Sequence, residues 1–415
     1  MRLHVNVSDR CKVAVTLPTS KSLSARALVL EALTDAPWTI ADVAQCDDTR
    51  AIAHALEVHG YVDRIDVGDA GTAMRFLTAY MATRTGIDVV LDGSERMRQR
   101  PIGPLVDALR QWGASITYLG EEGFPPLRIA GRALRGREIG VRADVSSQFI
   151  SALMMIAPVA GGATLHLEGD IVSQPYIAMT SSLMQRAGVP VTTADGGHTL
   201  IIPAGRYHPC SMRIEGDWSA ASYWIAWAAL LPATSFITLK GLACDSVQGD
   251  AQLLEWAPML GVQATWAADD VLQLRGGLPR EGHRELDLRD TPDLMPTLAV
   301  VQCLLDTPYR LSGLSTLRHK ESDRVACVQA QLRKLGYQVT VSRDGDIMEW
   351  NGAKCPAAAA PIVIDTAGDH RLAMAFSLAA ARCDALVIDH AEVVEKSYPD
   401  YWQHLRQAGF TLTSI

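Results

Sequence analysis

The stretch QAQLRKLGYQVTV, residues 329–341, has the pattern of a helix that stops at a glycine and continues into a strand. Gly336 is expected to end the helix in the left-handed conformation, and the alternating apolar residues after it suit a strand. The same order recurs five times, in AHALEVHGYVDRI, LVDALRQWGASITYL, SSLMQRAGVPVTT, LEWAPMLGVQATW and YWQHLRQAGFTLTSI. The recurrence predicts a fold of repeated α/β units.

The spacing of a second feature supports these repeats. An Asp near the start of another predicted helix precedes most copies, and Asp69, Asp144 and Asp217 each lie 44 residues before the next glycine (113−69, 188−144 and 261−217). Chance occurrence of helix, glycine and strand in an α/β protein is the alternative, and the repeated spacing argues against it. Periods of this length indicate supersecondary units that stack to bury their apolar faces. Six units in 415 residues predict two domains of three units, with a boundary near residues 203–217.

Composition narrows the class of protein. The formal net charge of -8 argues against a nucleic-acid or anionic-membrane partner, so any anionic ligand must be held by a local basic site. The eight cysteines show no C-x-x-C pair, and the eleven histidines show no H-E-x-x-H spacing, so we predict reduced thiols and no metal. The apolar run 223–237 is too short to span a bilayer and contains Pro232. We therefore expect a cytoplasmic protein.

Cationic residues stand where helices are predicted to begin. Because a helix N-terminus carries partial positive charge, a cation there is disfavoured by about 0.3–1 kcal/mol. An anion bound between these groups would reverse the sign, since helix N-termini bind phosphate and carboxylate groups well. The alternative is that Glu321 and Asp323 neutralise neighbouring cations on a solvated helix face. The cations are Lys21, Arg26, Arg75, Lys320, Arg324, His370 and Arg371.

Other polar side chains precede apolar helical stretches in the same way. Arg100 lies before Pro101, a residue that suits the first turn of a helix. Hydroxyls and an amide cluster at Ser146, Ser147 and Gln148, where Ser146 alone would suffice as a cap. Ser173 and Tyr176 add two hydroxyls, although this spacing is more often ordinary turn chemistry.

Nine motifs in chain order closely resemble the EPSP synthase family, the 3-phosphoshikimate 1-carboxyvinyltransferases of the shikimate pathway. They are PTSKSLSARAL, GDAGTAMRFL, RQRPIGPLVDAL, DVSSQFISALM, DWSAASY, TPDLMPTLAV, LRHKESDR, DHRLAMA and EKSYPDYW, and they span nearly the whole chain. The resemblance implies the two-domain α/β enolpyruvyl-transferase fold, with three units per domain related by a pseudo-threefold axis. Residues 18–216 would form one lobe and residues 1–17 with 217–415 the other, with the active site in the cleft between them. A monomer is expected.

The resemblance also implies the reaction. The enolpyruvyl group of phosphoenolpyruvate would pass to the 5-hydroxyl of shikimate 3-phosphate, releasing phosphate through a tetrahedral intermediate. This addition and elimination needs an acid and a base inside a cationic pocket, and it needs no cofactor or metal.

The family's functional residues can be carried over to this chain position by position. The catalytic residues implied are Lys21, Asp293 and Glu321. Those implied to bind phosphoenolpyruvate are Lys21, Gly71, Arg100, Gln148, Arg324, Arg371 and Lys396. Those implied to bind shikimate 3-phosphate are Lys21, Ser22, Arg26, Ser146, Ser147, Gln148, Ser173, Tyr176, Asp293 and Lys320.

Three positions depart from the family's pattern. Asp69 and Thr316 each stand where Asn is usual, and Phe76 stands where Pro is frequent. We expect Asp69 to turn away from the substrate and cap the following helix, because a carboxylate would repel phosphoenolpyruvate.

Two rival functions come from different classes. UDP-N-acetylglucosamine enolpyruvyl transferase shares the fold, but it usually has a Lys-Asn pair and a reactive loop cysteine. Here Ser22 follows Lys21, and residues 94–105 contain no cysteine. The second rival is a catalytically silent scaffold that binds anions. It conflicts with the retention of all three implied catalytic residues.

Overall fold

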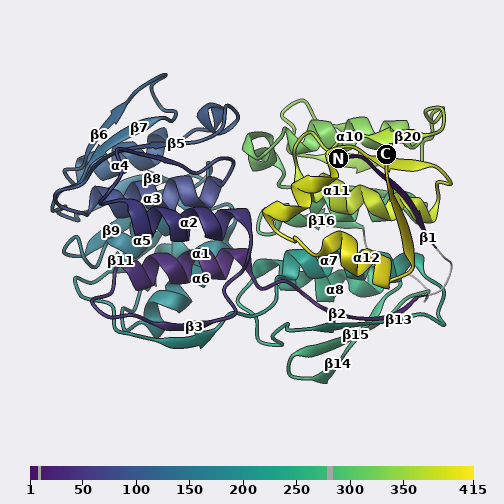
Figure 1. Cartoon of the computed structure of the whole chain (residues 1–415), viewed down its shortest axis with the longest axis horizontal. Coiled ribbons are helices and arrows are strands. Elements are labelled where there is room, and N and C mark those ends of the chain that lie inside the picture. Colours follow the sequence, from purple (N-terminus) through teal and green to yellow (C-terminus); the bar gives the residue numbers. More distant parts are fainter. Residues whose placement is uncertain (8–10, 278–283) are drawn as a thin grey trace. The chain divides into compact units, whose positions relative to one another are not determined.

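The computed structural model describes residues 1–7, 11–277 and 284–415. The chain divides into two compact units (Figure 1). The N-terminal unit is Ser20–Ile214, and the C-terminal unit combines Met1–Thr19 with Glu215–Ile415. Among the described residues, no helix is both long and apolar enough to cross a bilayer.

The N-terminal unit alternates helices and short strands. Its helices are α1 Lys21–Ala32, α2 Asp47–Val58, α3 Gly71–Ala82, α4 Gly103–Gln111, α5 Ser147–Ile156 and α6 Gln174–Arg186. Its strands are β3 Thr39–Ala41, β4 Arg64–Asp66, β5 Asp88–Asp92, β6 Ser115–Tyr118, β7 Leu127–Ala130, β8 Ile139–Arg142, β9 Ala163–Glu168, β10 Thr192–Ala194, β11 Thr199–Ile202 and β12 Ser211–Arg213.

The C-terminal unit follows the same alternation and adds short 3-10 turns that carry several polar residues. Its helices are α7 Trp218–Leu230, α8 Leu253–Trp256, α9 Met295–Leu304, α10 Arg324–Lys334, α11 His370–Ser377 and α12 Tyr401–Gln407. Its strands are β1 Leu3–Val7, β2 Lys12–Thr16, β13 Phe236–Lys240, β14 Gln263–Ala268, β15 Val271–Arg275, β16 Glu285–Asp287, β17 Tyr309–Ser312, β18 Thr340–Val341, β19 Met348–Trp350, β20 Ile362–Ile364, β21 Leu386–Ile388 and β22 Phe410–Ser414. Its 3-10 turns include η3 Gly249–Gln252, η5 Pro292–Leu294, η6 Ser315–His319 and η8 Ala391–Lys396.

Five sheets repeat one four-stranded topology in the described part of the chain. In each, the first two strands are parallel and the remaining pairs are antiparallel. The orders are β4-β5-β7-β6, β8-β9-β11-β10, β2-β13-β15-β14, β16-β17-β19-β18 and β20-β21-β1-β22. A sixth sheet contains only the parallel pair β3 and β12. The repeated pattern confirms the predicted α/β fold class.

Two of these sheets take a strand from a distant part of the sequence. β2 lies parallel to β13, so residues 12–16 complete a sheet whose other strands begin more than two hundred residues later. β1 pairs with both β21 and β22, and Figure 1 shows the two chain ends side by side. The N-terminal strands are therefore integral parts of the C-terminal unit.

One predicted helix stop is wrong in its detail. Gly113, Gly188, Gly261, Gly336 and Gly409 take φ values of 96°, 88°, 75°, 92° and 95°, as expected for left-handed stops. Gly60 does not take a positive φ. The helix ends instead in a turn in which the C-cap residue His59 stays in the right-handed helical region, with a φ of -56°, and the backbone N–H of Tyr61 donates to the carbonyl of Val58 at 2.8 Å. The chain then enters β4, which pairs parallel with β5 as the first strand of the next sheet.

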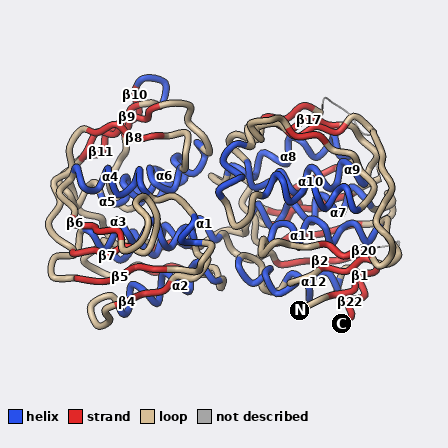
Figure 2. Tube along the Cα trace, turned by 90° about the horizontal axis from the view of Figure 1, so that it is seen from above, coloured by secondary structure: helices blue, strands red, loops and turns tan. Residues whose placement is uncertain are grey.

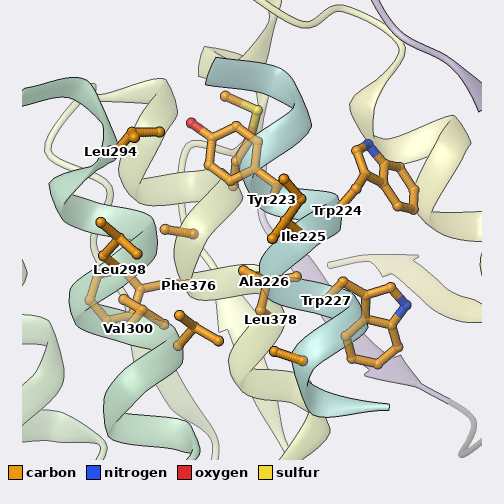
Figure 3. Packing of buried hydrophobic residues seen from close by; sticks show 14 of the residues in the cluster. Tyr223, Trp224, Ile225, Ala226, Trp227, Leu294, Leu298, Val300, Phe376 and Leu378 are labelled. Carbon is orange, nitrogen blue, oxygen red and sulfur yellow. The ribbon is translucent and has the colours of Figure 1, made fainter. Parts of the chain in front are cut away.

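Each unit has its own hydrophobic core, and Figure 2 shows helices running through the interior with strands around them. In the C-terminal unit, α7 is apolar on nearly all sides and is therefore buried against its neighbours. Side chains such as Trp227, Leu298 and Phe376 bring α7, α9 and α11 together (Figure 3). This packing fixes the relative positions of the helix starts, which carry the polar residues described next.

Candidate active site

The turn η5, which precedes α9, and the starts of α10 and α11 bring their charged side chains into one cluster in the C-terminal unit. Arg324 is the first residue of α10, and its side chain is only 1% exposed. Its Nη1 donates to Asp293 Oδ1 at 2.9 Å, and its Nη2 donates to Glu321 Oε2 at 2.9 Å. One guanidinium therefore joins the two carboxylates predicted to be catalytic.

Further cations surround the same carboxylates. Arg371 Nη2 donates to Asp293 Oδ2 at 2.8 Å, and Lys320 Nζ lies 3.7 Å from Asp293 Oδ1. Lys396 Nζ lies 3.2 Å from Glu321 Oε1. The structure thus brings together all the residues of this unit that were predicted as site residues.

These contacts control the charge of Asp293. Burial opposes its ionisation, but three nearby cations hold the pKa of Asp293 well below its usual range. In order of influence, they are Arg371, Lys320 and Arg324. The side chain is therefore an ionised carboxylate at neutral pH. As long as the cations hold it, it is a weak base.

Asp369, which is not among the predicted site residues, supports the cluster. It is fully buried at the N-cap of α11, where it accepts from the backbone N–H of Arg371 at 2.9 Å. Its two carboxylate oxygens accept from Arg324 Nε at 2.8 Å and Nη2 at 3.3 Å, which fixes the plane of that guanidinium. One feature of the sequence could have indicated this role: Asp369 directly precedes a predicted helix that starts with two cationic residues.

The motif LRHKESDR divides into different local roles. Asp323 caps α10 by accepting from the backbone N–H of Ala326 at 3.1 Å. Arg318 donates to the backbone carbonyl of Arg343 at 3.5 Å. Only Lys320, Glu321 and Arg324 of this motif make the charged contacts described above.

A second set of predicted residues lies in the N-terminal unit, around Arg26 of α1. Arg26 is 2% exposed, and its guanidinium donates to the Thr180 hydroxyl at 2.7 Å and the Ser151 hydroxyl at 3.1 Å. It also donates to the backbone carbonyls of Ser22 and Tyr176, at 2.9 and 3.4 Å. All of these partners are neutral, so burial lowers the pKa of Arg26 to about 10. Thr180 and Ser151 were missed because they lie within apolar helical stretches.

Gly71 lies directly against Arg100. A Cβ atom at Gly71 would be 2.6 Å from Arg100 Nη2, which is closer than a side chain tolerates. The absent side chain therefore allows the buried guanidinium to lie over the first turn of α3. Arg75 reaches the same region, donating to the backbone carbonyl of Pro101 at 2.8 Å.

The remaining polar residues of this unit lie at other helix starts. Ser146 caps α5 by accepting from the backbone N–H of Gln148 at 3.3 Å, and the Gln148 amide donates to the Thr72 hydroxyl at 3.2 Å. Ser147 is the first residue of α5. Lys21 opens α1 with its Nζ 3.6 Å from the buried carboxylate of Asp48. At the start of α6, Ser173 occupies the N-cap with a φ of 57°, and Tyr176 lies in the first turn.

The three unusual positions have distinct surroundings. The expectation that Asp69 caps α3 is wrong, because the N-cap of this helix is Ala70. The Asp69 carboxylate accepts a hydrogen bond from the Ser94 hydroxyl. Phe76 is buried, with its ring 5.3 Å from the Arg26 guanidinium carbon, so it contributes a cation–π contact. Thr316 lies in η6, partly exposed.

Solved structures with a similar arrangement define the class of fold. An EPSP synthase from Acinetobacter baumannii matches with a TM-score of 0.75 at 20% identity, over 100% of both chains. The enolpyruvyl transferase NikO from Streptomyces tendae matches with a TM-score of 0.73 at 16% identity, over 100% of this chain and 99% of the other. The fold is therefore that of the enolpyruvyl transferases.

Sequence comparison identifies the family. A family model described as EPSP synthase (3-phosphoshikimate 1-carboxyvinyltransferase) matches residues 5–63 and 56–405. The 3-phosphoshikimate 1-carboxyvinyltransferase of Bacteroides fragilis (strain YCH46) is 44% identical over 411 residues, covering 99% of this chain and 98% of the relative. The enzyme of that name from Vibrio cholerae (serotype O1, strain M66-2) is 36% identical over 420 residues, covering 95% and 96%. This chain belongs to the EPSP synthase family, which confirms the resemblance seen in its motifs.

Proposed function

We propose that this protein transfers the enolpyruvyl group of phosphoenolpyruvate to the 5-hydroxyl of shikimate 3-phosphate. The products are 5-enolpyruvylshikimate 3-phosphate and phosphate, as in the shikimate pathway of aromatic biosynthesis. Membership of the family supports this activity. The structural observation that carries the proposal is the joining of Asp293 and Glu321 through Arg324, which lies 2.9 Å from each. Two carboxylates held by cations suit a reaction of two anions that requires proton movements in both directions.

Asp293 is assigned as the base for the 5-hydroxyl, and Glu321 as the group that adds and removes the methylene proton. In the addition step, the hydroxyl oxygen bonds to the central carbon of phosphoenolpyruvate, and the methylene group gains a proton and becomes a methyl group. In elimination, the methyl group loses a proton and the bond to the phosphate oxygen breaks. Lys21 is assigned as an acid or base beside that oxygen.

The charge pairing suggests how substrate activates Asp293. Arg371 and Lys320 now neutralise this carboxylate. When anionic substrate groups engage these cations, they compete with Asp293 for them, so its pKa rises and it becomes a better base. Because hydrogen bonds between charged groups are strong, Arg371 then binds an anionic substrate group in preference to water.

The other predicted binding residues are assigned by substrate. We assign Arg100, Gln148, Arg324, Arg371 and Lys396, with Gly71 and Lys21, to phosphoenolpyruvate. We assign Ser22, Arg26, Ser146, Ser147, Ser173, Tyr176 and Lys320, with Lys21, Gln148 and Asp293, to shikimate 3-phosphate. The surroundings of Arg26 support its role, because its hydrogen-bond partners among the described residues are neutral, and a buried cation held only by neutral groups favours an anionic ligand.

The assigned residues belong to two different units, so catalysis requires both. We propose that residues 18–216 and residues 1–17 with 217–415 act as two lobes that close on the substrates and exclude water. We further propose that the enzyme works as a monomer in the cytoplasm. We also propose that it uses neither a cofactor nor a metal, because the reaction consists of proton transfers, formation of one carbon–oxygen bond and departure of phosphate, with no change of oxidation state.

Glu321→Gln tests the proposal. Loss of a general acid–base group costs about 10²–10⁴-fold in rate, so turnover should fall by that range while shikimate 3-phosphate still binds within about threefold of the wild-type affinity. Glu255→Gln, at an exposed position of α8, is the matched control and should retain turnover. Full turnover by Glu321→Gln would contradict the assigned role, and absence of turnover in the wild type would favour a binding scaffold.

A further inference from the structure

Asp250 is a buried carboxylate outside every motif that identified the family. It lies in η3, is 4% exposed, and its Oδ2 accepts a hydrogen bond from the Ser219 hydroxyl. Its Oδ1 is buried without a hydrogen-bond partner in the part of the chain that the structure describes. A carboxylate with so little compensation is costly to bury in its charged form.

Ser219 connects this carboxylate to the proposed active site. The Ser219 oxygen accepts from Arg371 Nη2 at 3.3 Å, and the same Nη2 donates to Asp293 Oδ2 at 2.8 Å. Because a guanidinium only donates hydrogen bonds, the single Ser219 hydrogen is free to point at Asp250. The contacts therefore run from Asp250 through Ser219 and Arg371 to Asp293.

The charged groups around Asp250 determine which protonation state it prefers. Burial raises the pKa of Asp250 to about 7, with Asp293 adding to the rise and Arg371 opposing it. Asp217, the N-cap residue of α7, also raises the pKa of Asp250, in the same direction as Asp293. Near neutral pH, a modest change of nearby charge is therefore enough to alter the protonation of Asp250.

We propose that Asp250 is a positioning residue that holds Arg371 through Ser219 in the empty enzyme and takes up a proton from solvent when an anionic substrate engages Arg371. This inference rests on the proposed function, because the anion is taken to be phosphoenolpyruvate. Neutral Asp250 removes one negative charge from beside the site, so the anion binds more tightly to that form. Proton uptake thus reduces the repulsion between the substrate and the acidic groups of this unit.

The sign of the pH effect follows from this coupling. The affinity for phosphoenolpyruvate should fall as the pH rises above about 7, where Asp250 ionises in the empty enzyme. If binding raises the Asp250 pKa by about one unit, KM should increase roughly five- to tenfold between pH 6.5 and 8.5 because of this group. Asp250→Asn keeps an oxygen that can accept from Ser219 but carries no charge. Its KM should lack this increase.

The experiment compares the KM for phosphoenolpyruvate and kcat from pH 6 to 9 in the wild type, Asp250→Asn, Ser219→Ala and Asp245→Asn. Asp245 is exposed and precedes η3, so its variant is the matched control and should follow the wild-type profile. Asp250→Asn should flatten the KM profile relative to wild type with kcat retained. Ser219→Ala should raise KM at pH 6.5, because Arg371 loses its second support.

Two results would overturn the inference while leaving the proposed function intact. One is a KM profile for Asp250→Asn that coincides with the wild-type profile. The other is loss of more than about a hundredfold in kcat, which would make Asp250 more than a positioning residue. If the wild type shows no turnover, the proposed function fails instead. Proton uptake on phosphoenolpyruvate binding, measured by calorimetry in two buffers, then decides the inference. Proton uptake by the wild type but not by Asp250→Asn supports the inference. Equal proton uptake by the two proteins overturns it.

Discussion

Replacing Arg324 by Met should destabilise the C-terminal unit strongly. Arg324 is buried and donates four hydrogen bonds, two to Asp369, one to Asp293 and one to Glu321. Met fills a similar volume with an apolar, adaptable side chain, so packing changes little. The variant therefore isolates the loss of the guanidinium charge and its hydrogen bonds.

The magnitude follows from the carboxylates left behind. Removing one partner of a buried ion pair typically costs about 3–5 kcal/mol, because the other charge remains buried and unpaired. Asp293 retains Arg371 and Glu321 retains Lys396, which limits the loss at those two residues. Although three carboxylates lose a partner, we therefore expect the total decrease in the free energy of unfolding to stay near about 3–5 kcal/mol. In a domain of about 200 residues it corresponds to a decrease of roughly 6–20 °C in Tm.

The loss should depend on pH with a definite sign. The pKa of Asp293 is depressed in the folded protein, so its pairing contributes stability above its ordinary value and loses that contribution as the pH falls. The difference between the wild type and Arg324→Met should therefore be largest at pH 7 and smaller near pH 4, where the orphaned carboxylates can take up protons.

Urea unfolding at the two pH values, followed by tryptophan fluorescence, measures this difference. Arg289→Met provides the control, because the Arg289 side chain is 48% exposed and its Nη2 lies 3.5 Å from Asp287 Oδ2. A surface pair of this kind contributes at most about 1 kcal/mol. A loss below about 1 kcal/mol for Arg324→Met at pH 7, or a loss that does not shrink at pH 4, would refute the reasoning.

Three further predictions concern single substitutions. Gly71→Ala should raise the KM for phosphoenolpyruvate at least about tenfold by displacing Arg100, whereas Gly60→Ala, where the added Cβ meets nothing within 4 Å, should leave it unchanged in steady-state assays. Asp250→Asn should be more stable than the wild type at pH 8 but not at pH 4. Because the pKa of Asp250 is raised to about 7 in the folded protein, burial of this side chain becomes increasingly unfavourable as the pH rises from the pKa of the unfolded state to about 7. Chemical denaturation at both pH values checks this prediction. Asp69→Asn should keep turnover within about an order of magnitude, because the carboxylate already bonds to Ser94, and a large gain in phosphoenolpyruvate affinity would show that Asp69 repels the substrate instead.

The repeated units could be predicted because they are encoded locally. A glycine after an amphipathic helix ends it, and the strand that follows is visible in the alternation of side chains. The pairing of β2 with β13 and of β12 with β3 could not be read in this way. These strands contain three to five residues, and their partners are chosen by the packing of whole units. Gly60 was mispredicted because glycine permits a positive φ but does not impose one.

The charged residues of the candidate site were visible from the sequence because they stand at unfavourable helix positions within recognisable motifs. The residues that hold them were not. Asp369 resembled an ordinary helix cap, and Thr180 and Asp250 lie in segments where nothing in the sequence distinguishes a polar partner of an arginine from a solvated side chain. Their contacts depend on tertiary packing.

The most direct test of the central claim is phosphate release from purified protein given phosphoenolpyruvate, with shikimate 3-phosphate, with UDP-N-acetylglucosamine, or with no acceptor. The account predicts release that requires shikimate 3-phosphate. Release only with the nucleotide sugar, or no release with either acceptor, would contradict it.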